Sequence, residues 1–164
     1  MTHNDILRSV RYMLDLSDPQ LAAVFDLGGM KVTQEKLASW LLKDDEEGYV
    51  PCPDLPMSHF LNGLVIYRRG RDDTRPAQPL EESVTNNIVL KKLRVAFELK
   101  EDDMHAVLQL AGFEVSRPEL SALFRKEGQK NYRACGDQLL RNFLRGLTLR
   151  VRGSTPAPAR PLED

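Results

Sequence analysis

The chain has 164 residues, of which 23 are basic and 24 acidic, so its formal net charge is −1. Its content of 41% hydrophobic and 29% charged residues is typical of a soluble globular protein, and no apolar run approaches the roughly 20 residues of a membrane-spanning helix. The N-terminal residues lack the pattern of a secretory signal, and two cysteines cannot form a disulfide framework. We therefore expect a cytoplasmic protein without membrane association.

The chain contains one sequence unit twice. Residues 4–70 align without a gap on residues 87–153 at a constant offset of 83, and 20 of the 67 aligned pairs are identical, where chance would give roughly four. A unit of this size buries only about 60% of its unfolded surface, so we expect the two copies to pack on each other or on another chain. Residues 71–86 are predicted to form an exposed linker, and the proline-rich residues 154–164 a disordered tail.

Four helices are predicted in each copy. In the first copy, apolar residues recur at helical spacing over residues 5–16, 19–27, 34–43 and 55–69, and the second copy repeats this pattern. The inward positions of the second copy include Val89, Leu93 and Phe97, then Val107, then Leu120 and Leu123, then Phe143, Leu144 and Leu147. Neither copy contains an alternating segment bounded by turns, so no sheet is predicted. The fold class is therefore all-α, with two tandem four-helix repeats related by a pseudo-two-fold axis.

Most polar residues that occur in both copies fall at predicted helix ends. Their side-chain oxygens would cap the free N–H groups of the first turn. The predicted N-cap pairs are Asn4 and Asn87, Thr33 and Ser116, and Asp54 and Asp137. We interpret these residues as structural.

A glycine pair lies in the middle of the fourth predicted helix. Gly63 and Gly146 both stand in a Phe-Leu-x-Gly-Leu sequence, although a glycine inside a helix costs about 1 kcal/mol relative to alanine. Its presence in both copies predicts that another helix crosses closely at this point. We expect the fourth helix of each copy to be central. One arrangement that fits this expectation has the two fourth helices meeting across the pseudo-two-fold axis.

Several longer motifs resemble the YehS-like bacterial family. They are Asn86-Asn87-Ile88-Val89-Leu90-Lys91-Lys92-Leu93-Arg94, Cys135-Gly136-Asp137-Gln138 and Phe143-Leu144-Arg145-Gly146-Leu147, with matching stretches at residues 4–12 and 60–64. The resemblance covers both copies and leaves out only the linker and the tail. It implies a tandem-repeat fold in a cytoplasmic bacterial setting. The family has no assigned function, so the resemblance implies no catalytic or binding residues.

The sequence does not favour an enzyme. It contains no nucleotide-binding glycine loop, no serine nucleophile elbow and no zinc-binding spacing of cysteine and histidine. His59 is the one base predicted near Cys52, and its counterpart in the second copy is Asn142. We interpret Cys52 and Cys135 as small buried side chains. No catalytic residue, cofactor or metal ion is predicted, and the acidic residues 44–47 are interpreted as a solvated helix end.

The two copies differ in charge. Residues 4–70 carry 7 basic and 10 acidic side chains, whereas residues 87–153 carry 13 basic and 8 acidic ones. A basic face could bind the phosphates of DNA or RNA, or it could serve only solubility or contacts with the acidic copy. Residues 21–42 also fit a helix-turn-helix, although their charges are mixed. The candidate contacts for phosphate or for a partner are Lys91, Lys92, Arg94, Lys130, Arg133, Arg141, Arg145 and Arg152.

Two duplicated pairs are candidates for a shared polar corner. They are Arg11 with its counterpart Arg94, and Tyr49 with its counterpart Tyr132. The tyrosine would close the corner between the third and fourth helices, and the arginine would support it. Taken together, the sequence predicts a non-catalytic binding module with a regulatory or adaptor role through a protein partner or self-association. Nucleic-acid binding by the second copy is the alternative.

Overall fold

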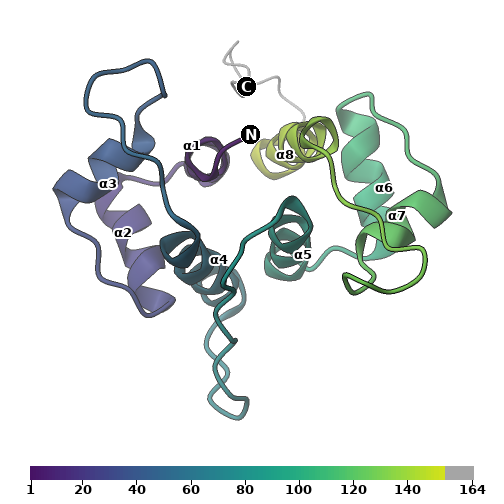
Figure 1. Cartoon of the computed structure of the whole chain (residues 1–164), viewed down its shortest axis with the longest axis horizontal. Coiled ribbons are helices and arrows are strands. Elements are labelled where there is room, and N and C mark those ends of the chain that lie inside the picture. The colour runs from purple at the N-terminus through teal and green to yellow at the C-terminus, as the bar shows by residue number, and fades with distance from the viewer. Residues whose placement is uncertain (154–164) are drawn as a thin grey trace.

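The computed structural model describes residues 1–153, and the predicted disordered tail at 154–164 lies outside this part. The described residues form eight helices and no strand (Figure 1). The helices are α1 (His3–Leu14), α2 (Asp18–Leu27), α3 (Gln34–Leu41) and α4 (Asp54–Arg69), then α5 (Asn86–Ala96), α6 (Glu101–Leu110), α7 (Arg117–Leu123) and α8 (Asp137–Arg152). The prediction of an all-α protein with two four-helix repeats is confirmed.

The helix N-termini are capped by threonine and serine side chains. Thr2, Ser17, Thr33, Thr85 and Ser116 each accept a hydrogen bond from a backbone N–H in the first turn of the following helix. The prediction for Thr33 and Ser116 is therefore confirmed.

The other predicted N-caps were wrong. Asn4 and Asn87 lie inside α1 and α5, because the threonine two residues earlier already caps each helix. Asp54 and Asp137 are the first residues of α4 and α8 and follow the N-cap residue. All four side chains are consequently free to bond to other parts of the chain.

The first helix of each repeat packs on the last helix of the other repeat. The pair α1 and α8 and the pair α4 and α5 form the centre of the molecule, as Figure 1 shows. Helices α2 and α3 lie on one side of this centre, and α6 and α7 lie on the opposite side. The two repeats thus pack on each other through these helix pairs across the pseudo-two-fold axis, while α1 also packs on α3 of its own repeat.

Each long helix is crossed closely by the second helix of its own repeat. A Cβ atom placed on Gly63 would lie 1.9 Å from the carbonyl oxygen of Val24 in α2. A Cβ atom on Gly146 would lie equally close, at 1.9 Å, to the carbonyl oxygen of Val107 in α6. The predicted close crossing is therefore present. The principal neighbours of α4 are α2 and α5, so the crossing partner is not the other long helix.

Hydrogen bonds at the start of α4 and α8 connect each of these helices to the first helix of its own repeat and to the segment that precedes the first helix of the other repeat. Asp54 accepts from Nε2 of His3 at 2.7 Å and from the backbone N–H of Val84 at 3.2 Å. In the equivalent arrangement, Asp137 accepts from Asn86 at 2.8 Å and from the amino group of Met1 at 2.6 Å. The segment before each first helix therefore contacts the last helix of the other repeat.

None of the helices in residues 1–153 has both the length and the apolar character that crossing a membrane requires.

Candidate binding site

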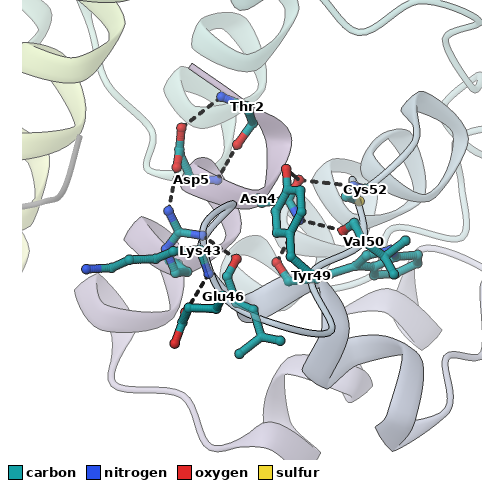
Figure 2. A network of polar contacts seen from close by, with 11 residues as sticks. Thr2, Asn4, Asp5, Lys43, Glu46, Tyr49, Val50 and Cys52 are labelled. Carbon is teal, nitrogen blue, oxygen red and sulfur yellow. Dashed lines mark hydrogen bonds and ion pairs between the residues drawn. The ribbon is translucent and has the colours of Figure 1, made fainter.

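The loop between α3 and α4 is organised by one buried asparagine. Nδ2 of Asn4 donates to the carbonyl oxygens of Trp40 and Val50, both at 2.9 Å, and Oδ1 of Asn4 accepts from the backbone N–H of Cys52 at 3.0 Å. The hydroxyl group of Tyr49 also points to Oδ1 of Asn4, at 3.4 Å (Figure 2). A side chain of α1 therefore holds both ends of this loop.

The second repeat contains the same arrangement. Nδ2 of Asn87 donates to the carbonyl oxygens of Leu123 at 3.0 Å and Arg133 at 2.8 Å, and Oδ1 of Asn87 accepts from the N–H of Cys135 at 2.8 Å. Asn4 is 1% exposed, whereas Asn87 is half-buried. Because each asparagine uses its amide to fix backbone groups, we assign both a structural role.

The loop of the first repeat borders an open hollow of ≈ 240 Å³. Side chains of both charges line it together with polar groups, namely Thr2, Asp5, Arg8, Lys43, Asp44, Asp45 and Tyr49. Arg8 is held in place by an ion pair with Asp5 and by a hydrogen bond of 2.9 Å to the carbonyl oxygen of Leu42. Figure 2 shows Lys43, Glu46 and Tyr49 around the same loop. The hollow is therefore lined by a preformed set of charged and hydrogen-bonding groups.

In the first repeat alone, one large apolar side chain is exposed within this loop and another directly after it. Val50 is 45% exposed and Leu55 is 49% exposed, although both are large and apolar. Their counterparts in the second repeat are Arg133 and Gln138. The first repeat therefore combines exposed apolar side chains with an acidic loop, and the second repeat does not.

The two cysteines are buried next to this loop. Cys52 and Cys135 are each 6% exposed, as predicted for small core side chains. Burial raises the pKa of the Cys52 thiol to about 12 and that of the Cys135 thiol to about 11, and the neighbouring aspartate adds to each shift. A thiol in this state is a poor nucleophile at neutral pH. Within residues 1–153 no group of three or more His, Cys, Asp or Glu side chains could hold a metal ion.

The predicted basic contacts do not form one uniform surface. Lys91, Lys130 and Arg145 are exposed. Arg133 forms an ion pair of 2.7 Å with Glu119, whose carboxylate offsets the positive charge of the arginine. Lys91, Lys130 and Arg145 form no side-chain hydrogen bond or ion pair within residues 1–153, so an external phosphate could reach them without displacing a partner.

Arg152 and Lys92 are engaged by the protein, whereas Arg141 is half-buried and acts on Asp137, whose pKa its charge helps to lower. Nη1 of Arg152 donates to the carbonyl oxygen of Tyr12 at 2.8 Å, and its guanidinium lies 4.4 Å from the centre of the Tyr12 ring. Nζ of Lys92 lies 3.4 Å from Oε1 of Gln78, and burial lowers the pKa of this lysine. Arg141 is half-buried, and its Nε atom is buried without a hydrogen-bond partner in residues 1–153.

The residues of the predicted polar corner lie at two places. Tyr49 lies in the corner, where it contacts Asn4, and Tyr132 occupies the equivalent half-buried position. Arg11 forms an ion pair of 2.8 Å with Asp18 at the start of α2. Arg94 donates to the carbonyl oxygen of Leu99 at 3.0 Å and stacks 4.7 Å from the ring centre of Phe124. The arginines therefore fix the turns between the first and second helices.

Asn4 lies at the centre of the corner, and this role was not predicted from the sequence. Asn4 is identical in both copies, which led to its interpretation as an N-cap. The available signal was Thr2, which precedes Asp5 by three residues and so has the spacing of a capping box. With the N-cap position already occupied, an asparagine shared by both copies needed another explanation.

These features define a tandem-repeat helical protein with one organised loop corner in each repeat. Residues 3–70 and residues 86–153 each match the family described as "Protein of unknown function (DUF1456)", and the chain belongs to this family. It is also 52% identical over 150 residues to the "Uncharacterized protein YehS" of Escherichia coli (strain K12). The aligned region covers 92% of this chain and 96% of that protein. The resemblance predicted from the sequence motifs is therefore confirmed. No solved structure matches the chain.

Proposed function

We propose that this protein is a non-catalytic binding module that acts as a regulator or adaptor through contacts with another protein. The binding face would be the loop corner of the first repeat. Its partner would offer apolar side chains together with basic ones.

The exposed apolar pair beside the acidic loop is the observation that supports this proposal. Val50 and Leu55 lie on either side of Cys52 in the sequence and are both exposed, and Val50 directly follows Tyr49, which lines the hollow together with Asp44 and Asp45. Protein interfaces commonly combine an apolar centre with a polar rim. The corner is also preformed, because Asn4 fixes the loop from inside, and a preformed loop loses less conformational entropy when it binds.

Site-specific photo-crosslinking tests this face. A photoreactive amino acid is placed at position 50 and, as the matched control, at the equivalent position 133 of the second repeat. We expect one protein partner to crosslink at position 50 but not at position 133. The purified partner should then bind the Val50→Ser/Leu55→Ser double variant at least about tenfold more weakly than the unsubstituted chain, because loss of two apolar contacts is worth a few kcal/mol. Equal crosslinking at positions 50 and 133, with no protein captured at position 50 alone, would contradict the proposal.

Nucleic-acid binding by the second repeat is the alternative, and the exposure of Lys91, Lys130 and Arg145 is the observation in its favour. Binding to generic DNA and RNA is measured across a salt series, with a Lys130→Gln/Arg145→Gln double variant alongside. Phosphate contacts predict that log K falls linearly with log salt, and that the slope decreases by about 0.9 for each contact removed from B-DNA. No binding at low salt would eliminate this alternative.

A further inference from the structure

The second half of the linker lies along one face of α4 and is held there by its backbone. Nδ2 of Asn62 donates to the carbonyl oxygens of Gln78 and Pro79, both at 3.3 Å, and the N–H of Glu81 donates to the Ser58 hydroxyl group at 2.9 Å. Ser58 is 3% exposed and Asn62 is 5% exposed. An extended segment of the chain therefore takes part in burying two polar side chains of this helix.

The equivalent face of α8 carries two arginines. Arg141 stands at the position of Ser58, and Arg145 stands at the position of Asn62. Within residues 1–153, Arg145 is exposed and has no hydrogen-bond or ion-pair partner. The buried Nε of Arg141 also has no hydrogen-bond partner there. An unsatisfied buried N–H is costly, so this face has donors that need an acceptor.

The linker sequence that covers α4 recurs after α8. Residues 76–82 read Pro-Ala-Gln-Pro-Leu-Glu-Glu, and residues 158–164 read Pro-Ala-Arg-Pro-Leu-Glu-Asp, so five of the seven positions are identical. The offset is 82, one less than the offset between the helices of the two repeats. The repeated unit therefore extends beyond the helices and includes the segment that docks on the fourth one.

The recurring segment is long enough to reach the arginines. Arg145 lies eight residues before Gly153, which corresponds to about 12 Å along a helix. The seven residues from Gly153 to Arg160 can span up to about 23 Å when extended. In the first repeat the chain makes the same return, from Gly70 to the Asn62 contact at Gln78.

We propose that residues 158–164 dock along α8 over Arg141 and Arg145, as residues 76–82 dock along α4. Arg145 takes the place of Asn62 and donates to backbone carbonyl groups of the segment. This substitution suits the role, because a guanidinium offers five N–H donors where the asparagine amide offers two.

The position of Ser58 differs between the two repeats in its hydrogen-bonding chemistry. Ser58 accepts a hydrogen bond from the N–H of Glu81, but an arginine at that position can only donate. Arg141 therefore pairs with the carboxylate of Glu163, the counterpart of Glu81, and Asp164 adds a second negative charge beside the two arginines. Residues 158–164 carry two acidic residues and one basic residue, Arg160, so their net negative charge favours this segment as the occupant. The inference does not depend on the proposed protein partner of the first repeat.

Backbone relaxation of the ¹⁵N-labelled full chain tests the docking. We expect order parameters of residues 158–164 to resemble those of residues 76–82 and to exceed about 0.6, the level below which backbone is flexible. Arg145→Glu should lower them below this level in residues 158–164 only. Asn62→Ala should do the same for residues 76–82, which shows that the assay detects release from the helix.

Lys130→Glu is the matched control, because it makes the same change of charge in the second repeat away from the α8 face. It should leave residues 158–164 as ordered as in the unsubstituted chain. Order parameters below about 0.6 in the unsubstituted chain would overturn the proposal, as would order that survives Arg145→Glu or is lost equally in Lys130→Glu. Order that falls on dilution would assign the occupant to a second copy of the chain and would also overturn docking within one molecule.

Discussion

Replacing Asn4 with alanine removes the side chain that holds the loop of the first repeat. Three hydrogen bonds at 2.9 to 3.0 Å are lost, and each is worth about 1 kcal/mol net. We therefore expect the free energy of unfolding to fall by about 3 kcal/mol. With a urea m-value of about 2 kcal/mol/M, the unfolding midpoint should fall by about 1.5 M while the m-value stays constant.

Asn87→Ala is the matched control for this experiment. The side chain makes the equivalent three bonds but is half-buried, so water can replace part of what is lost. We expect a loss of about 1–2 kcal/mol. A loss below about 0.5 kcal/mol in Asn4→Ala, the range of an ordinary surface substitution, would refute the reasoning. A larger loss in Asn87→Ala than in Asn4→Ala would refute it as well.

Three further predictions concern the helix crossing, the thiols and an ion pair. Gly63→Ala should lower the free energy of unfolding by about 3 kcal/mol or more, because the added Cβ would overlap a carbonyl oxygen of α2. Gly136→Ala is the control and should cost no more than about 1 kcal/mol, because an added Cβ would meet no atom within 4 Å. Equal urea midpoints for the two variants would contradict this. Cys52 and Cys135 should react with a thiol reagent at pH 8 at least about 100-fold more slowly in the folded than in the unfolded chain, with Cys52 the slower, and rapid labelling of the folded protein would show that the thiols are accessible. Hydrogen bonds from Ser116 and Arg133 lower the pKa of Glu119 from 4.5 to about 2. The contribution of the ionised Glu119 to stability is therefore present above pH 4.5 and is lost as the pH falls toward 2. Glu119→Gln should flatten the fall of the urea midpoint over this pH interval, and an unchanged pH dependence would argue against the ion pair.

The local structure could be predicted from the sequence because it depends on local signals. The apolar spacing located all eight helices, and a glycine shared by both copies located the close crossing at Gly63. These signals concern neighbours along one helix and the space beside it. They are present in the residues themselves.

The packing of each first helix on the last helix of the other repeat could not be predicted in the same way. An apolar stripe on α1 requires a partner surface, but the stripe is the same whether that surface is the last helix of its own repeat or that of the other. The choice depends on contacts between residues far apart in sequence, such as Met1 with Asp137. Asn4 was missed for a related reason, since its partners Trp40 and Val50 are more than thirty residues away.

The reciprocal packing of first and last helices also bears on the ancestry of this chain. A single unit equivalent to residues 3–70 would expose the faces of α1 and α4 that pack on α8 and α5 in this protein. Two identical units could bury these faces by packing on each other in the same reciprocal way. The present protein joins two such units in one chain. Fusion releases the halves from having to be identical, which gives a physical reason why one could become acidic while its twin became basic.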